Sequence, residues 1–261
     1  MLRSARFMSS IALTAVIGAC AKEASISEVS GGCADVYTAQ VCTFASMKGT
    51  AVLEVGATVP IASIQNSPTV EAMVWPPVAN AVLDVPEPAR NESGLTHFTM
   101  YWEASGHPPG PYMQPHFDFH FYIVPNASRT AIDCKDVTKP AALPAGYALL
   151  DIPLPPDMAK MTGVSTLVGI CVPQMGMHSL PAAELESKDP FRGDMVVGSY
   201  AGKTVFIEPM VTKAMLMEKK SFDLPIPTIP GIGAHPTKFH AEFDAAKQSY
   251  RFALSGFVPA A

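Results

Sequence analysis

Hydrophobic and polar residues alternate along several stretches of the chain. Five runs combine this period of two with aromatic and β-branched residues, as half-buried strands do: residues 96–104, 116–124, 204–211, 238–244 and 249–257. Only Ala245 to Gln248 separate the last two runs, which predicts a β-hairpin. Short helices are expected at 181–188 and 212–220, with a strand as the alternative for the second segment. The pattern predicts a mainly β fold, an antiparallel sandwich or barrel with one or two short helices.

Proline is unusually frequent, with 25 of the 261 residues. Its fixed φ and missing N–H disfavour long helices and central strands, so the prolines are expected in ordered loops and edge segments such as 106–115 and 224–236. The chain has no internal repeat and no second linker-like stretch. It therefore predicts a single β-rich domain over residues 33–261.

Charge is sparse, because only 16% of the residues are charged and 48% are hydrophobic. Such a chain is expected to fold densely rather than remain disordered. The formal net charge of -5 provides no basic surface for phosphate backbones, so nucleic acid is not expected as a partner.

The first nineteen residues are typical of a signal peptide. Arg3 and Arg6 precede an apolar stretch, residues 11–19, that is too short to cross a bilayer as a helix. The stretch ends in Ile17-Gly18-Ala19-Cys20, a pattern that resembles the bacterial lipobox. In that interpretation Cys20 becomes a lipidated N-terminus.

Lipidation at Cys20 predicts a membrane-anchored protein of the cell envelope or periplasm. Residues 20–32 are polar and are expected to form a flexible tether. The alternative is cleavage by the ordinary signal peptidase within residues 19–21, which would release a soluble protein.

Five cysteines leave one thiol unpaired in an oxidising compartment. If Cys20 carries lipid, the remaining four can form two disulfides with three connectivities. Cys33 with Cys42 is the most economical pair, which leaves Cys134 with Cys171. The spacing contains no CxxC motif, so a thiolate metal site is disfavoured.

The run "PHFDFHFY" contains the clearest chemical pattern. On a strand, His116, Asp118 and His120 lie on one face, and the three intervening phenylalanines lie on the other. Imidazole and carboxylate groups together suit a divalent ion such as zinc, manganese or iron. The alternative is a partly buried hydrogen-bond network without an ion.

Geometry limits how these side chains can share one ion. His116 and His120 are about 13 Å apart on a regular strand, and neighbours on one face are about 7 Å apart. Either the ion binds Asp118 with one histidine, or a β-bulge brings both histidines together. His178 is the best further ligand, because it follows a predicted strand at 165–172 and a glycine-containing turn. Other histidines, such as His107, also lie in turn-like contexts.

Glu208 lies between apolar neighbours in the run 204–211. A buried glutamate needs an ion, an arginine or a histidine as a partner, so Glu208 is a candidate metal ligand or catalytic general base. An exposed edge residue before Pro209 is the alternative. A carboxylate pair with Asp118 for acid–base chemistry on sugars is disfavoured.

Longer strings carry a resemblance to a known family. "EASGHPPGPYMQPHFDFHFYIV", "VPQMGMH", "FIEPMVT" and the C-terminal hairpin resemble an uncharacterised family of bacterial exported proteins, a domain of unknown function, over residues 85–257. The resemblance implies a compact β-rich exported domain and no particular reaction. It also implies that the motif positions are His107, His116, Asp118, His120 and His178. Ser179 stands where the family pattern has an aromatic residue, so the resemblance says least about the packing around His178.

Two functions follow from these observations. The first is an exported metal-binding domain. Its more specific form is a metal-dependent enzyme that acts on an unidentified small molecule. The second is a non-catalytic, envelope-tethered module whose His/Asp network is structural and whose surface binds a partner or forms a homo-oligomer. Serine-hydrolase, HExxH and P-loop motifs are absent from the sequence.

Overall fold

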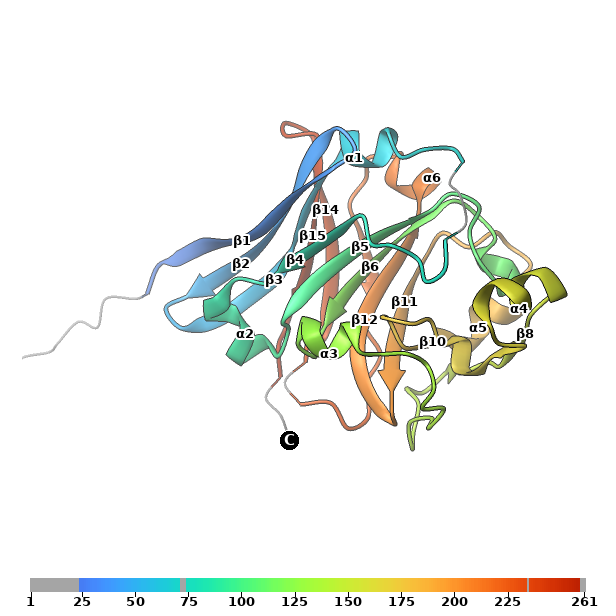
Figure 1. Cartoon of the computed structure of the whole chain (residues 1–261). Helices are drawn as coiled ribbons and strands as arrows, with labels where there is room; N and C mark the ends of the chain where they lie inside the picture. Colours follow the sequence, from blue (N-terminus) through green and yellow to red (C-terminus); the bar gives the residue numbers. More distant parts are fainter. Residues whose placement is uncertain (1–23, 71–73, 234, 259–261) are drawn as a thin grey trace, which may run out of the picture.

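Two large antiparallel sheets pack face to face in the computed structural model, which describes residues 24–70, 74–233 and 235–258 (Figure 1). The six-stranded sheet has the order β1 (Ile26–Val36), β2 (Ala39–Lys48), β3 (Ala51–Pro60), β15 (Ser249–Ser255), β14 (Lys238–Asp244) and β13 (Phe222–Pro225). The seven-stranded sheet has the order β4 (Ala81–Asp84), β5 (His97–Glu103), β6 (His116–Tyr122), β12 (Lys203–Thr212), β11 (Gly193–Tyr200), β10 (Met177–Pro181) and β7 (Tyr147–Ala148). β8 (Ile152–Pro153) and β9 (Thr166–Leu167) form a third sheet. Neither large sheet closes on itself, so the predicted mainly β fold is confirmed as a sandwich rather than a barrel.

The five alternating runs all form strands, namely β5, β6, β12, β14 and β15, and the last two make the predicted hairpin. The strand predicted at 165–172 is wrong. Only the two residues of β9 belong to a strand there, and the 3₁₀ helix η2 (Val168–Ile170) follows. Gly169 has a φ of 62°, which an extended strand does not allow.

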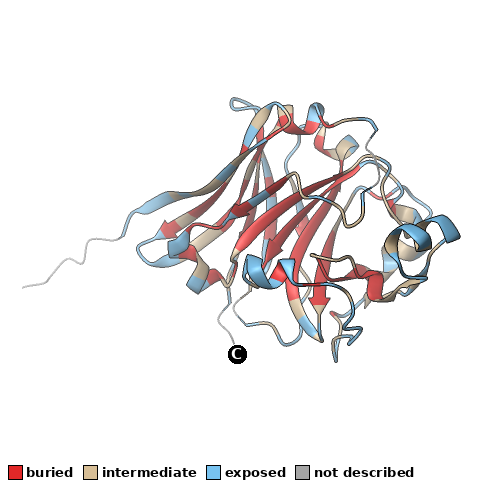
Figure 2. Ribbon diagram, in the orientation of Figure 1, coloured by how far each residue is buried: buried red, intermediate tan, exposed pale blue. Residues whose placement is uncertain are grey.

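The phenylalanines of β6 face the six-stranded sheet, as their alternation predicts. The ring centroid of Phe119 lies 4.5 Å from that of Phe252 in β15, and Phe117 and Phe121 are also fully buried. This inner interface is the main core of the domain (Figure 2).

The opposite face of β6 is also covered. A second hydrophobic cluster packs over the outer face of the seven-stranded sheet, and its buried members are Tyr101, Tyr112, Tyr122, Ile170, Met175, Leu180, Phe191, Val196, Val205, Phe206 and Met210. The polar row of β6 therefore lies in a second interior and not on an open surface.

Short helices connect the strands: α1 (Ile61–Gln65), α2 (Glu87–Ser93), η1 (Gly110–Tyr112), α3 (Asn126–Thr130), α4 (Pro156–Thr162), α5 (Ala182–Glu186) and α6 (Lys213–Leu216). The helices predicted at 181–188 and 212–220 are present as α5 and α6. Proline occupies the N-cap of each of α1 to α5. At a helix start the missing N–H costs no intrahelical hydrogen bond, which explains how a proline-rich chain folds densely.

One proline contradicts the expectation that proline avoids central strands. Pro209 lies within β12, between β6 and β11. The ladder between β12 and β6 pairs Ile207 with Phe121 and resumes at Met210 with Asp118, leaving a gap at residues 208–209. Because proline has no N–H to donate, the ladder opens beside Glu208.

The N-terminal boundaries differ in part from the expectation. Residues 26–32, predicted as part of the tether, belong to β1, which pairs with β2. Alternating polar and small residues hid this strand in the sequence. The predicted signal peptide (1–19) and Cys20 lie outside the described residues. No helix in the described ranges has the length and apolar character needed to cross a membrane.

Both predicted disulfides are present. Cys33 pairs with Cys42 across β1 and β2, and Cys134 pairs with Cys171 at the end of η2. Two disulfides are consistent with an oxidising, extracytoplasmic compartment.

Candidate metal centre

Three strands of the seven-stranded sheet bring the candidate ligands together on its outer face. β6 carries the row His116, Asp118 and His120, all of them buried. The register between β12 and β6 places Glu208 beside His120, and β10 adds His178 from the far side of β11.

These side chains form two groups, and the ligand atoms within each group lie within 4.8 Å of one another. We call His120, His178 and Glu208 the Glu208 group, and His107, His116 and Asp118 the Asp118 group. Each group offers two imidazoles and one carboxylate, a ligand set found at zinc and non-haem iron sites.

The Glu208 group is centred on a single carboxylate oxygen. Oε2 of Glu208 lies 3.5 Å from Nε2 of His120 and 3.9 Å from Nε2 of His178. Ligands about 2.1 Å from a tetrahedral ion are separated by about 3.4 Å. The observed spacing therefore leaves room for an ion between these atoms.

The Asp118 group uses both oxygens of its carboxylate. Oδ1 of Asp118 lies 3.2 Å from Nε2 of His116, and Oδ2 lies 3.8 Å from Nε2 of His107. These separations also match the spacing of ligands around one ion.

Several of these ligand atoms are buried without a hydrogen-bond partner. The set comprises His116 Nε2, Asp118 Oδ1, His120 Nδ1, His120 Nε2 and Glu208 Oε2. Burying a polar atom without a partner costs roughly 1–3 kcal/mol, so such atoms are rare in folded proteins. Half of the ten such atoms among the described residues lie in the two groups, which could hold a cation.

Backbone carbonyls orient three of the four histidines. Nδ1 of His116 donates to the Gln114 oxygen at 2.6 Å, and Nδ1 of His178 donates to the Ile170 oxygen at 2.9 Å. Nδ1 of His107 donates to the adjacent Pro108 oxygen at 3.0 Å. A carbonyl only accepts, so Nδ1 carries a proton in all three rings, and Nε2 is the nitrogen that can bind an ion when the ring is neutral.

Burial determines the charge of the Glu208 group. It raises the pKa of Glu208 well above the usual value, and the nearby Asp118 carboxylate adds to this shift. Burial also lowers the pKa of His120 well below its usual value and that of His178 to about 4. The two imidazoles are therefore neutral at physiological pH, which is the form that binds metal ions.

Within the Asp118 group, the histidines and the carboxylate partly balance one another's charge. Burial opposes ionisation of Asp118, but the adjacent His116 and His107 outweigh it and hold the pKa of this carboxyl below its usual range. Burial likewise opposes protonation of His107, while the Asp118 carboxylate raises the pKa of His107 to about 9.

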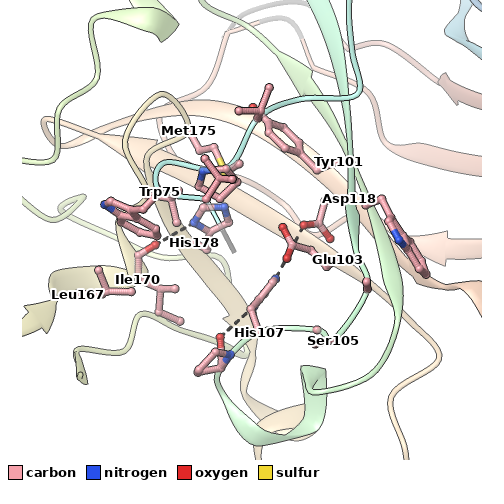
Figure 3. A pocket seen from close by; sticks show the side chains of 18 of the residues that line it. Trp75, Tyr101, Glu103, Ser105, His107, Asp118, Leu167, Ile170, Met175 and His178 are labelled. Carbon is pink, nitrogen blue, oxygen red and sulfur yellow. Dashed lines mark hydrogen bonds and ion pairs between the residues drawn. The ribbon is translucent and has the colours of Figure 1, made fainter. Parts of the chain in front are cut away.

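A cavity of about 610 Å³ opens above both groups (Figure 3). His107 and Asp118 of one group and His178 of the other contribute to its lining. The remaining lining is largely apolar and includes Trp75 and Met158. A pocket of this size and character suits a small, largely apolar organic molecule.

The four metal ligands expected from the sequence are divided between the two groups. His116 and Asp118 lie in one, and His120 and His178 lie in the other, in agreement with the distance that a regular strand imposes. Glu208 joins the second group as a buried residue, not an exposed one. His178 lies within β10, not on a turn as expected.

The sequence places His107 in a turn-like context, and the resemblance implies it as a motif position, but it is not among the four metal ligands expected from the sequence. β5 and β6 form an antiparallel pair in which Glu103 lies opposite His116. The connecting loop must therefore begin and end beside His116. Sequence reasoning could have used this hairpin geometry to infer that His107 lies close to His116 and Asp118.

No family model, curated protein or solved structure matches the chain. The resemblance to a family of exported bacterial proteins therefore stays a prediction, and the site is interpreted from its own geometry.

Proposed function

We propose that this protein is an exported metal-dependent enzyme whose ion is bound by the Glu208 group. The observation that carries this proposal is the buried Glu208 oxygen, placed between two neutral imidazoles at the spacing of metal ligands and without a hydrogen-bond partner. Among the ion pairs of the described residues, none joins Glu208 to lysine or arginine. A divalent cation supplies the compensation that the chain lacks.

The ligand set supports catalysis as well as binding. Three protein ligands leave at least one coordination position open, and an ion so held can polarise a carbonyl or lower the pKa of a bound water. His178 belongs both to this group and to the cavity lining, so a small molecule in the pocket could reach an ion held there. Zinc, manganese and iron all accept two imidazoles and a carboxylate.

The shape of the pocket suggests the class of substrate. Apolar side chains such as Trp75, Met158 and Leu167 line its walls. From the two groups, His107, Asp118 and His178 also line it. We propose a small molecule with an apolar body and an oxygen-bearing group that reaches the ion.

Thermal unfolding of the chelator-treated protein tests the metal site. Zinc, manganese or iron(II) is added in turn to the wild type, to His178→Ala and to His240→Ala. His240 is a half-exposed histidine outside both groups and serves as the matched control. At least one metal is expected to raise Tm in the wild type and the control by clearly more than in His178→Ala. Equal Tm values with and without every metal would instead support a structural His/Asp network in a non-catalytic module.

Export and lipid attachment at Cys20 are part of the same proposal. The two disulfides support an oxidising compartment. Cys20→Ser is expected to move the protein from the membrane fraction to the soluble fraction of the cell envelope. If the wild type is already in the soluble fraction and Cys20→Ser has the same distribution, ordinary signal-peptidase cleavage is favoured.

A further inference from the structure

The Asp118 group has no role in the function proposed so far, although it lines the same pocket. We propose that it is a second metal site, so that the pocket holds two divalent ions side by side along β6. This inference rests on the proposed function, which assigns metal-dependent chemistry to the pocket. The ion of the Asp118 group can nevertheless be counted separately from that of the Glu208 group.

Unpartnered atoms provide the first argument. Nε2 of His116 and Oδ1 of Asp118 are buried and 3.2 Å apart, yet neither has a hydrogen-bond partner. The His116 side chain is fully buried, and only 6% of the Asp118 side chain is exposed. A contact this short without hydrogen-bond geometry is expected where two atoms face a common cation.

Ring orientation provides the second argument. Nδ1 of both His107 and His116 donates to a backbone carbonyl, which directs each Nε2 toward Asp118. Hydrogen bonds of this kind fix the tautomer of metal-binding histidines and hold their rings in place.

The loop that carries His107 is itself fixed. The backbone N–H of His107 donates to the backbone oxygen of Tyr112 at 3.2 Å. The Tyr112 hydroxyl donates to the Asp194 carboxylate at 3.0 Å. Gly106 has a φ of 66°, and a Cβ atom there would overlap the Tyr112 oxygen and the Gln114 backbone. Only glycine fits this turn, so the position of His107 is built into the hairpin.

Exposure distinguishes the two sites. The His107 side chain is 33% exposed, whereas that of His178 is 11% exposed and that of His120 is fully buried. The ion of the Asp118 group is therefore expected to exchange faster and to be the first one that a chelator removes. Because Asp118 and His178 both line the pocket, one ligand could contact both ions.

Equilibrium dialysis against zinc, manganese or iron(II), followed by elemental analysis, counts the ions per chain. For the metal that binds best, the wild type and His240→Ala are expected to hold two ions and His107→Ala one. A wild-type count below two overturns the second site, and a count of zero overturns the proposed function as well.

A count other than one in folded His107→Ala also overturns the second site. Folding of each variant is checked by cooperative thermal unfolding. His116→Gln, for which one ion is again expected, replaces His107→Ala if that variant does not fold.

Discussion

Nε2 of His120 lies 3.5 Å from Oε2 of Glu208, and both atoms are buried without a hydrogen-bond partner. Pro209 interrupts the ladder between β12 and β6 at this point. A folded chain rarely keeps two facing polar atoms unpaired in its interior. The relationship is explained if both atoms are ligands of one cation.

Glu208→Gln tests this explanation with almost no change in shape. Burial raises the pKa of Glu208 well above its usual value, so the neutral amide is a close substitute and the metal-free free energy of unfolding is expected to change by less than about 1 kcal/mol. An ion held by the Glu208 group at a hundred times its Kd stabilises the wild type by about 2.7 kcal/mol, and the variant is expected to lose this contribution. Thermal unfolding with and without metal measures both quantities.

Glu242→Gln is the matched control, because Glu242 is an exposed glutamate in β14 of the other sheet. It is expected to keep the full metal-dependent gain. A Glu208→Gln protein that is stabilised by metal as strongly as the wild type would show that Glu208 is not a ligand.

The disulfide between Cys134 and Cys171 supports the site indirectly. Cys171 follows Ile170, whose carbonyl orients His178. Replacing both cysteines by serine is expected to weaken metal binding about tenfold, as loss of an orienting contact does. It is also expected to lower the free energy of unfolding by about 3–4 kcal/mol, because the disulfide closes a loop of 37 residues.

The disulfide between Cys33 and Cys42 provides the comparison. It lies in the other sheet and closes a loop of 9 residues, so its double serine variant is expected to lose about 2–3 kcal/mol. Its metal affinity, measured by calorimetric titration, should equal that of the wild type. Equal losses of affinity in both variants would rule out a specific role for the Cys134–Cys171 bond.

Gly198 allows the Phe206 ring to lie against the strand beside the site. A Cβ atom at residue 198 would overlap that ring, whose centroid lies 4.5 Å from His120 and 5.1 Å from His178. Gly198→Ala is expected to destabilise the fold by about 1–3 kcal/mol and to weaken metal binding. Gly110→Ala, where no atom lies within 4 Å of the new Cβ, should do neither. Chemical denaturation and metal titration of both variants give the comparison.

The strand arrangement could be predicted from the sequence to the extent that it depends on local alternation. The five runs from 96–104 to 249–257 became strands because aromatic and polar positions alternate in each. β1 could not be predicted in this way, since its residues are small, polar and partly exposed. Edge strands of this kind depend on pairing with a neighbour more than on their own pattern.

Asp194 gives a pH-dependent prediction away from the ligands. Burial raises the pKa of Asp194 to about 6, although the hydrogen bond from Tyr112 partly opposes the shift. The folded state therefore binds the Asp194 proton more tightly than the unfolded state does. The stability that this proton contributes to the folded state is lost as pH rises from about 4 to about 6. Asp194→Asn is expected to gain on the order of 1 kcal/mol relative to the wild type across this window.

Urea unfolding of both proteins between pH 4 and pH 8 measures this difference. The amide oxygen introduced by Asp194→Asn can still accept the Tyr112 hydrogen bond, so the comparison isolates the charge. A difference between the two proteins that does not change with pH would contradict the raised pKa.

Candidate ligands could be recognised from the sequence, but their grouping could not. Residue spacing on one strand showed that His116 and His120 lie too far apart to share an ion easily. It could not show that Glu208 comes from the adjacent strand, or that this proline-containing strand is central in its sheet. Both depend on register between distant segments, which single-strand periodicity does not specify.

Elemental analysis of natively purified protein tests the central claim most directly. The protein is isolated without chelators or added metal, and zinc, manganese and iron are measured per chain beside Glu208→Gln prepared in the same way. We expect at least one stoichiometric transition-metal ion in the wild type and a clear loss in the variant. A wild-type protein that carries no metal, and gains none when each ion is supplied, would contradict the account.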